Sequence, residues 1–176
     1  MREDYGTQLE DGSLRFVRDL PGPIERVWEY LVDPEKRALW FCGGTAGATA
    51  GDRFVMRFNH DDISPEKLPE RHAGMQGGVE MGGTVVEIHP PNLFVMSWDG
   101  GNEECRFELT PMGDRVRLVL IQAPSRDHAD LIDMACGWHA QVGILVDRLS
   151  GIEIRGFWTE HDGVEEYYRR LIKPTD

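Results

Sequence analysis

Cysteines, long apolar runs and familiar catalytic signatures are scarce or missing in this sequence. Its three cysteines, Cys42, Cys105 and Cys136, are an odd number without CxxC spacing, which favours reduced thiols over a disulfide framework or a zinc site. No stretch of about 18 apolar residues occurs and the first residues lack an apolar core, so we expect neither a membrane helix nor a signal peptide. A GxSxG elbow, a GK[ST] phosphate loop and the HExxH and EF-hand patterns are also missing. We therefore expect a cytoplasmic protein, without a cofactor, that is neither a nucleophilic hydrolase nor a P-loop nucleotide binder.

Basic residues are outnumbered, with 19 Lys and Arg against 31 Asp and Glu and a net charge of −12. A surface of this sign repels a phosphate backbone, so we predict no nucleic-acid partner, and the missing apolar run predicts no membrane partner. The 176 residues are 40% hydrophobic and 28% charged, as in an ordinary globular chain. We predict one domain over residues 1–176.

The first part of the chain alternates between strand and helix patterns. Residues 13–20, SLRFVRDL, predict a strand, and the PGP that follows ends it. Ile24 begins an apolar spacing of three and four residues that predicts a short helix, and the Asp33-Pro34 pair separates it from a second short helix that ends near Trp40.

The middle of the chain predicts sheet. Residues 52–58, DRFVMRF, alternate between an apolar and a wetter face, which is typical of a strand. Residues 59–83 are polar and rich in glycine and proline, so we expect a long loop that acts as a mobile lid. Four strands should then form an antiparallel meander: TVVEIH, LFVMSWD, ECRFELT and RVRLVLIQ, separated by the turn sequences PPN, GGN and PMGD.

A long amphipathic helix should follow, from about residue 125 to residue 149. Its apolar stripe consists of Leu131, Ala135, Trp138, Val142, Leu145 and Leu149. This order of elements predicts an α+β fold with helices against one face of an antiparallel sheet.

The sequence resembles the START-like or SRPBCC superfamily, whose fold is that of birch-pollen allergen. It looks most similar to the branch of homologues of the heat-shock-protein-90 ATPase activator. The resemblance is carried by PGPIERVWEYLVDPEKRALWF, GGTVVEIHPPNLFVMSWDGG and GWHAQVGILVDRLSG and covers about residues 14–151. It implies a helix-grip fold, in which a curved antiparallel sheet wraps around one long C-terminal helix, with two short helices after the first strand. The core would be about residues 13–151, and residues 152–176 would be a C-terminal extension.

The resemblance also implies an elongated cavity between sheet and helix that holds a small apolar or amphipathic molecule. We predict that the bulky residues facing it line this cavity, although an aromatic stripe at such spacing is equally typical of an ordinary core. The predicted lining is Trp40, Phe54, Met56, Phe58, Phe94, Met96, Trp98, Phe107, Leu118, Met134, Trp138, Val142 and Leu145. We favour a non-enzymatic binding protein. The alternatives are a chaperone-associated protein like the ATPase activator, with a chaperone as its partner, and a cyclase or hydratase acting on a cavity-bound substrate.

Some polar residues could in principle bind a metal ion or take part in catalysis. A metal site can be imagined from His60, Asp61, Asp62 and His72, but this segment also suits a solvated turn, so we predict no metal site. For acid–base catalysis, Glu87 and His89 share one strand face and His139 flanks the helix stripe, yet we expect structural roles for all three and predict no catalytic residue. Cys136 has no neighbouring base and should be inert.

The back of the long helix is unusually apolar. It carries Cys136, Ala140, Gly143 and Ile144 where a surface helix would carry charged side chains, so another segment should cover it. Residues 152–176 contain enough large apolar side chains to do so. They could fold back within the chain or reach a second subunit, and we favour a homodimer through this extension or the back of the helix.

Overall fold

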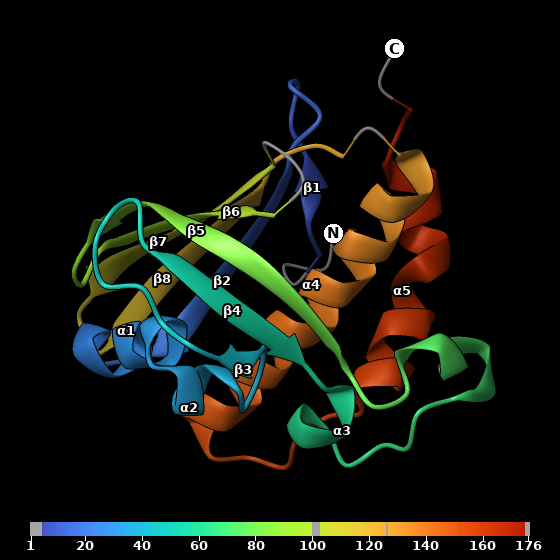
Figure 1. The fold of residues 1–176 in the computed structure, drawn as a ribbon, viewed down its shortest axis with the longest axis horizontal. Coiled ribbons are helices and arrows are strands. Elements are labelled where there is room, and N and C mark those ends of the chain that lie inside the picture. The colour runs from blue at the N-terminus through green and yellow to red at the C-terminus, as the bar shows by residue number, and fades with distance from the viewer. Residues whose placement is uncertain (1–4, 100–102, 126, 175–176) are drawn as a thin grey trace.

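One curved antiparallel sheet organises the protein. The computed structural model describes residues 5–99, 103–125 and 127–174. The sheet has eight strands in the order β1-β2-β8-β7-β6-β5-β4-β3 (Figure 1). They are β1 (Thr7–Gln8), β2 (Leu14–Pro21), β3 (Gly43–Gly44), β4 (Arg53–Phe58), β5 (Val79–His89), β6 (Leu93–Trp98), β7 (Glu104–Met112) and β8 (Arg115–Gln122).

The helices lie against the concave face and the ends of this sheet. They are α1 (Ile24–Val32), α2 (Pro34–Arg37), α3 (His60–Ile63), the 3-10 helix η1 (Glu70–Met75), α4 (His128–Ser150) and α5 (Phe157–Leu171). Figure 1 shows α4 between the curved sheet and α5. This is the predicted α+β helix-grip arrangement, including the two short helices after the long N-terminal strand β2. The expectation is therefore confirmed.

Local patterning accounts for the meander and the long helix. From β5 to β8 each strand pairs antiparallel with the next, and β2 pairs with β8 from Leu14 opposite Gln122 to Pro21 opposite Arg115. β7 and β8 alternate buried and more exposed positions, because their inner residues face α4 and their outer residues face solvent. The predicted stripe of α4 is buried along its whole length. The predicted GGN turn, at residues 100–102, lies outside the described residues.

The segment from 59 to 83 differs from the expected loop. It contains α3 and η1, and β5 begins at Val79, five residues before the predicted strand. Asn59 caps α3, because its side chain accepts a hydrogen bond from the Asp61 N–H. Glycines and polar residues in this segment made the composition typical of a loop, although the backbone forms regular elements. The role of the segment as a mobile lid stays a prediction.

The C-terminal extension packs against the back of α4 in its own chain. Phe157, Trp158, Val164 and Tyr168 of α5 are buried, as are Cys136 and Ala140 of α4. A Cβ atom added at Gly143 would lie 2.7 Å from Nη1 of Arg155. This glycine therefore lets the extension approach α4 closely, as predicted from the small residues on the back of the helix. Folding back within the chain is thus the arrangement adopted. A homodimer stays a prediction, and it would have to use surfaces other than these buried groups.

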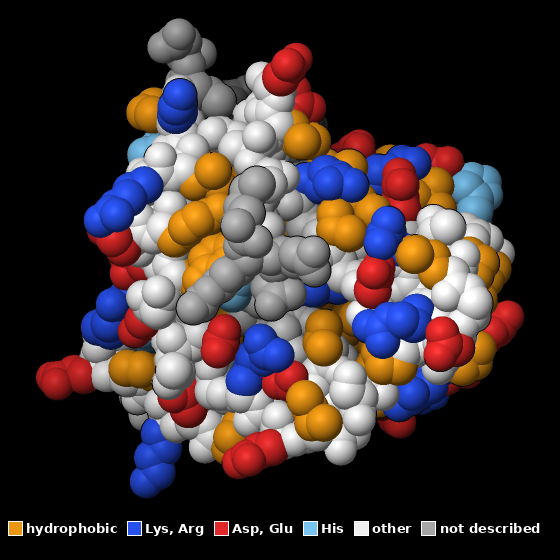
Figure 2. All heavy atoms as spheres, turned by 180° about the vertical axis from the view of Figure 1, so that it is seen from behind, with side chains coloured by type: hydrophobic (Ala, Val, Ile, Leu, Met, Phe, Trp, Pro, Cys, Tyr) orange, Lys and Arg blue, Asp and Glu red, His pale blue; other side chains and the backbone are white. Residues whose placement is uncertain are grey.

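The remaining surface is mixed in character. On the face seen in Figure 2, hydrophobic side chains are interspersed with Lys, Arg, Asp and Glu. None of the helices in the described ranges combines the length and apolar character needed to cross a membrane.

Candidate functional site

A pocket of about 420 Å³ lies between the sheet and α4. Three parts of the chain form its walls: strands β4 to β6, the middle of α4, and the facing surfaces of the 60–75 segment and early α5. Most lining side chains are aromatic, methionine or histidine. The lining residues are Phe41, Phe58, His60, His72, Met75, Val79, Met81, Trp98, Asp99, Glu103, Asp133, Met134, Gly137, Trp138, Gln141, Phe157, Trp158 and His161.

Trp138 fixes one wall of this pocket. Its ring centroid lies 4.8 Å from that of Phe41 and 5.7 Å from that of Phe107, and its Nε1–H donates to Oε1 of buried Gln122 at 3.1 Å. The side chain is only 3% exposed. Trp138 is therefore both a core residue and a wall of the pocket.

The predicted cavity residues divide into two groups. Phe58, Trp98, Met134 and Trp138 line this pocket. The others do not line it and are buried in the core beside it: Trp40, Phe54, Met56, Phe94, Met96, Phe107, Leu118, Val142 and Leu145. Trp40 anchors its loop, since its Nε1–H donates to the carbonyl of Tyr30. The assignment of all thirteen to a ligand cavity stays a prediction.

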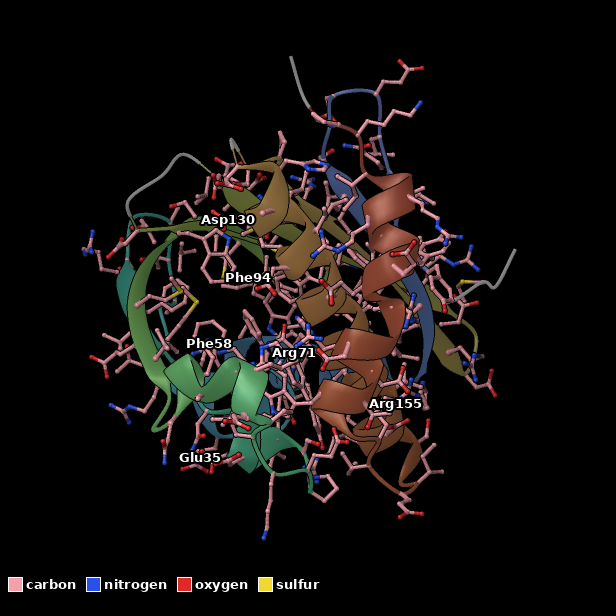
Figure 3. All side chains as sticks on the ribbon, turned by 90° about the vertical axis from the view of Figure 1, so that its right-hand side faces the viewer. Glu35, Phe58, Arg71, Phe94, Asp130 and Arg155 are labelled. Atoms are coloured by element: carbon pink, nitrogen blue, oxygen red, sulfur yellow. The ribbon has the colours of Figure 1, made fainter. Side chains whose placement is uncertain are left out.

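The 60–75 segment is held against the start of α5 by hydrogen bonds. The N–H groups of the first turn of a helix have no partners within the helix. Here the N–H of Phe157 donates to Oγ of Ser64 at 2.8 Å, and the N–H of Thr159 donates to Oε2 of Glu66 at 2.9 Å. Side chains that are distant in sequence thus cap α5. In Figure 3, Phe58 lies on the sheet side and Arg71 on the helix side of this region.

Histidines and carboxylates gather where this segment meets α5. Nε2 of His72 and Nδ1 of His161 each lie 3.0 Å from Oδ1 of Asp162, and Nε2 of His161 lies 3.2 Å from Oδ1 of Asp133. The side chain of His161 is 6% exposed, whereas that of Asp133 is largely exposed. His72, His161 and Asp133 of this cluster therefore line the pocket, and the Asp133 carboxylate is also open to solvent.

His60 and His161 of the pocket wall differ in the direction of their pKa shifts. Burial lowers the pKa of His60 to about 4, and the nearby His161 adds to the effect, so the His60 ring is neutral near neutral pH. Burial also opposes protonation of His161, but hydrogen bonds to Asp133 and Asp162 and their charges outweigh it and raise its pKa. The pocket wall thus combines a neutral ring with one held between two carboxylates.

The other polar candidates lie away from the pocket. Nε2 of His89 lies 2.9 Å from Oε1 of Glu87 on an exposed strand face. His139 is buried between α4 and α5, with Nδ1 at 3.1 Å from the hydroxyl of Tyr168. Burial raises the pKa of Cys136 to about 12, which disfavours the reactive thiolate. Asp61 and Asp62 are exposed and do not join His72.

Several residues that line the pocket were not predicted from the sequence. Val79 and Met81 fell in the expected loop, and Phe157, Trp158 and His161 fell in the extension. One local signal was present, since Trp158 and His161 are three residues apart and share a helix face. No sequence signal links His72 to residues of α5 some ninety positions later.

The chain is similar to a known protein family and to several solved structures. The family model described as activator of Hsp90 ATPase homolog 1-like protein matches residues 21–150. The solution NMR structure of a Bordetella parapertussis protein is 37% identical to this chain with a TM-score of 0.83, covering 96% of this chain and 91% of that one.

Two more distant structures share the fold alone. CalU16 from Micromonospora echinospora is 19% identical with a TM-score of 0.67, covering 96% of this chain and 94% of that one. The Aha1 dimer from Colwellia psychrerythraea is 13% identical with a TM-score of 0.56, covering 78% and 95% of the respective chains. A search of the curated proteins found no match.

Proposed function

Since the chain belongs to the family of activator of Hsp90 ATPase homolog 1-like proteins, we propose that it binds a small apolar or amphipathic molecule between its sheet and α4. The observation that carries this proposal is the pocket of about 420 Å³ beside Trp138, which has a mainly aromatic and methionine wall. Its size and lining are typical of small-molecule sites. Val79 and Met81 are more than one-third exposed and offer an apolar entrance.

Retention and stabilisation of a ligand test this proposal. Native mass spectrometry of freshly purified protein should detect a retained small molecule. In thermal-shift measurements with fatty acids, sterols, flavonoids and polyketides, a cognate ligand at about one hundred times its Kd should stabilise the fold by roughly 2.7 kcal/mol. The proposal fails if nothing is retained and no compound class shifts the melting temperature.

A pair of glycine substitutions locates the binding site. A Cβ atom added at Gly137 of α4, which lines the pocket, or at Gly163 of α5, which does not, would meet no atom within 4 Å. Gly137→Met and Gly163→Met should therefore both fold, with a gain of up to about 1 kcal/mol because glycine is a poor helix former. Only Gly137→Met should fill the pocket and abolish the ligand-induced shift. Equal ligand responses in the two variants would contradict the assigned site.

Chaperone association is the second candidate, and family membership is the observation that favours it. A pull-down with the chaperone tests for binding. We expect that this 176-residue chain alone will not measurably accelerate the chaperone's ATP hydrolysis, because one small domain makes too few differential contacts to stabilise a large closed conformation. A several-fold stimulation in a coupled ATPase assay would reverse the order of the two candidates.

A further inference from the structure

The cluster at the end of the pocket has the composition and spacing of a metal site. Nε2 of His72, Nδ1 of His161 and Oδ1 of Asp162 all lie within 4.8 Å of one another. Ligand atoms about 2.0–2.1 Å from a tetrahedral Zn²⁺ ion are about 3.3 Å apart. The two separations that involve Asp162 are 3.0 Å each, so they already lie close to this value.

Proton counting at His161 supports a cation in this cluster. A neutral imidazole carries one N–H, yet both ring nitrogens of His161 face a carboxylate oxygen, from Asp133 and from Asp162. A protonated ring satisfies both contacts, because each nitrogen then donates to a carboxylate oxygen. A neutral ring that donates from Nε2 to Asp133 satisfies them equally well when a metal ion lies between the Nδ1 lone pair and the oxygen of Asp162.

The surroundings of His161 are also those of a metal ligand. Ligating histidines commonly donate their second N–H to a carboxylate, which fixes the tautomer and the ring orientation. Asp133 is placed to accept this hydrogen bond at 3.2 Å. The ring of His72 is oriented separately, because it stacks on Trp158 with a centroid distance of 4.1 Å.

We propose that His72, His161 and Asp162 bind a divalent transition-metal ion, such as Zn²⁺, at the pocket wall. Two imidazoles and one carboxylate suit this class of ion better than Mg²⁺ or Ca²⁺, which prefer oxygen ligands. Three protein ligands leave a fourth position for water or for an oxygen atom of a bound molecule. His72 and His161 line the pocket, so this position is near its space. The proposal does not rest on ligand binding in the pocket.

Arg71 is the group that competes with the metal. Its Nη2 lies 3.2 Å from Oδ1 of Asp162 but 2.9 Å from Oε2 of Glu165, and its side chain is half exposed. The contact with Glu165 can hold the guanidinium when a metal ion takes the oxygen of Asp162. Because binding must replace one exposed charge contact, which is worth little, Arg71 does not block the site.

The test uses the full, untagged chain after treatment with a chelator. Titration with Zn²⁺ by calorimetry should give one equivalent, and Co²⁺ should produce the visible absorption of a tetrahedral ion. No thiolate charge-transfer band should accompany it, because Cys42, Cys105 and Cys136 are buried. Absence of both the Zn²⁺ heat and the Co²⁺ absorption would overturn the proposal.

Substitutions locate the ion. His72→Gln and Asp162→Asn should each weaken Zn²⁺ binding at least tenfold, whereas His89→Gln, in the exposed pair with Glu87, should leave it unchanged. Asp133→Asn should weaken binding by about tenfold while keeping the Co²⁺ spectrum, since Asp133 only positions His161. Circular dichroism checks that each variant folds. Wild-type affinity in folded His72→Gln or Asp162→Asn would refute the site, and if neither variant folds, the Co²⁺ spectrum of the wild type decides.

Discussion

Removal of residues 152–176 should destabilise the protein severely without changing its oligomeric mass. Phe157, Trp158, Val164 and Tyr168 would be lost from the core. Burial of a large apolar side chain is worth about 1.5–3 kcal/mol, so the four together represent on the order of 6–12 kcal/mol. The truncated chain also avoids the entropy cost of ordering these residues, so the net loss is smaller than this sum. Domains are typically stable by only about 5–15 kcal/mol, so even a net loss of a few kcal/mol is severe. Thermal unfolding followed by circular dichroism measures the loss.

Polar contacts made by the extension increase this effect. Asp147 is buried in α4 and accepts hydrogen bonds from the backbone N–H, Nε and Nη2 of Arg155. Truncation removes all of these donors, so the charge-assisted hydrogen bonds between Asp147 and Arg155 are lost. The hydroxyl of Tyr168, which accepts from the N–H of Gly6, would also be lost.

The outcome of the truncation shows whether the extension covers α4 of its own chain or α4 of a second subunit. Light scattering should give the same oligomeric mass for the full chain and for any folded truncated chain, because the extension packs within its own chain. A chain truncated after Lys173 keeps α5 and serves as the control, with an unchanged melting temperature. An unchanged melting temperature after truncation at Gly151 would contradict the packing, and conversion of a dimer into a monomer would support the predicted homodimer.

Local patterns made the sheet and the long helix predictable. In β8 every second residue, including Val116, Leu118 and Leu120, faces inward, so alternation in the sequence directly indicates a half-buried strand. The stripe on α4 is equally local, because residues three and four apart share a helix face. The structure of these elements follows from neighbours in sequence.

The 59–83 segment could not be predicted in this way. Its helices are short and its contacts come from distant parts of the chain, as when Ser64 and Glu66 cap the N-terminus of α5. The candidate metal site also depends on contacts between residues that are distant in sequence. His72 contributes from this segment and Asp162 from α5, and single-sequence periodicity carries no information about such a pairing.

Trp138→Ala should lower the free energy of unfolding by about 3–5 kcal/mol, the range for a large core aromatic. The residue lines the pocket, but it is almost fully buried and packs against Phe41 and Phe107. Its loss also leaves Oε1 of Gln122 without the indole donor, at an added cost of about 1–3 kcal/mol if no water replaces it. Urea unfolding monitored by circular dichroism gives the difference.

The size of the loss in unfolding free energy shows whether Trp138 is packed in the core or only faces the pocket. A tryptophan that merely faces an existing cavity has few packed neighbours to lose, so a loss below about 1.5 kcal/mol would contradict the core role. Trp138→Phe is the matched control, because it keeps an aromatic ring beside Phe41 while removing the N–H, and it should cost less than the alanine variant. If the pocket holds a ligand, the alanine variant should also shift its preference toward bulkier molecules, because the removed indole leaves space next to Met134 and Gly137. A core-sized loss together with this shift is the result expected for a side chain that belongs to both the core and the pocket wall.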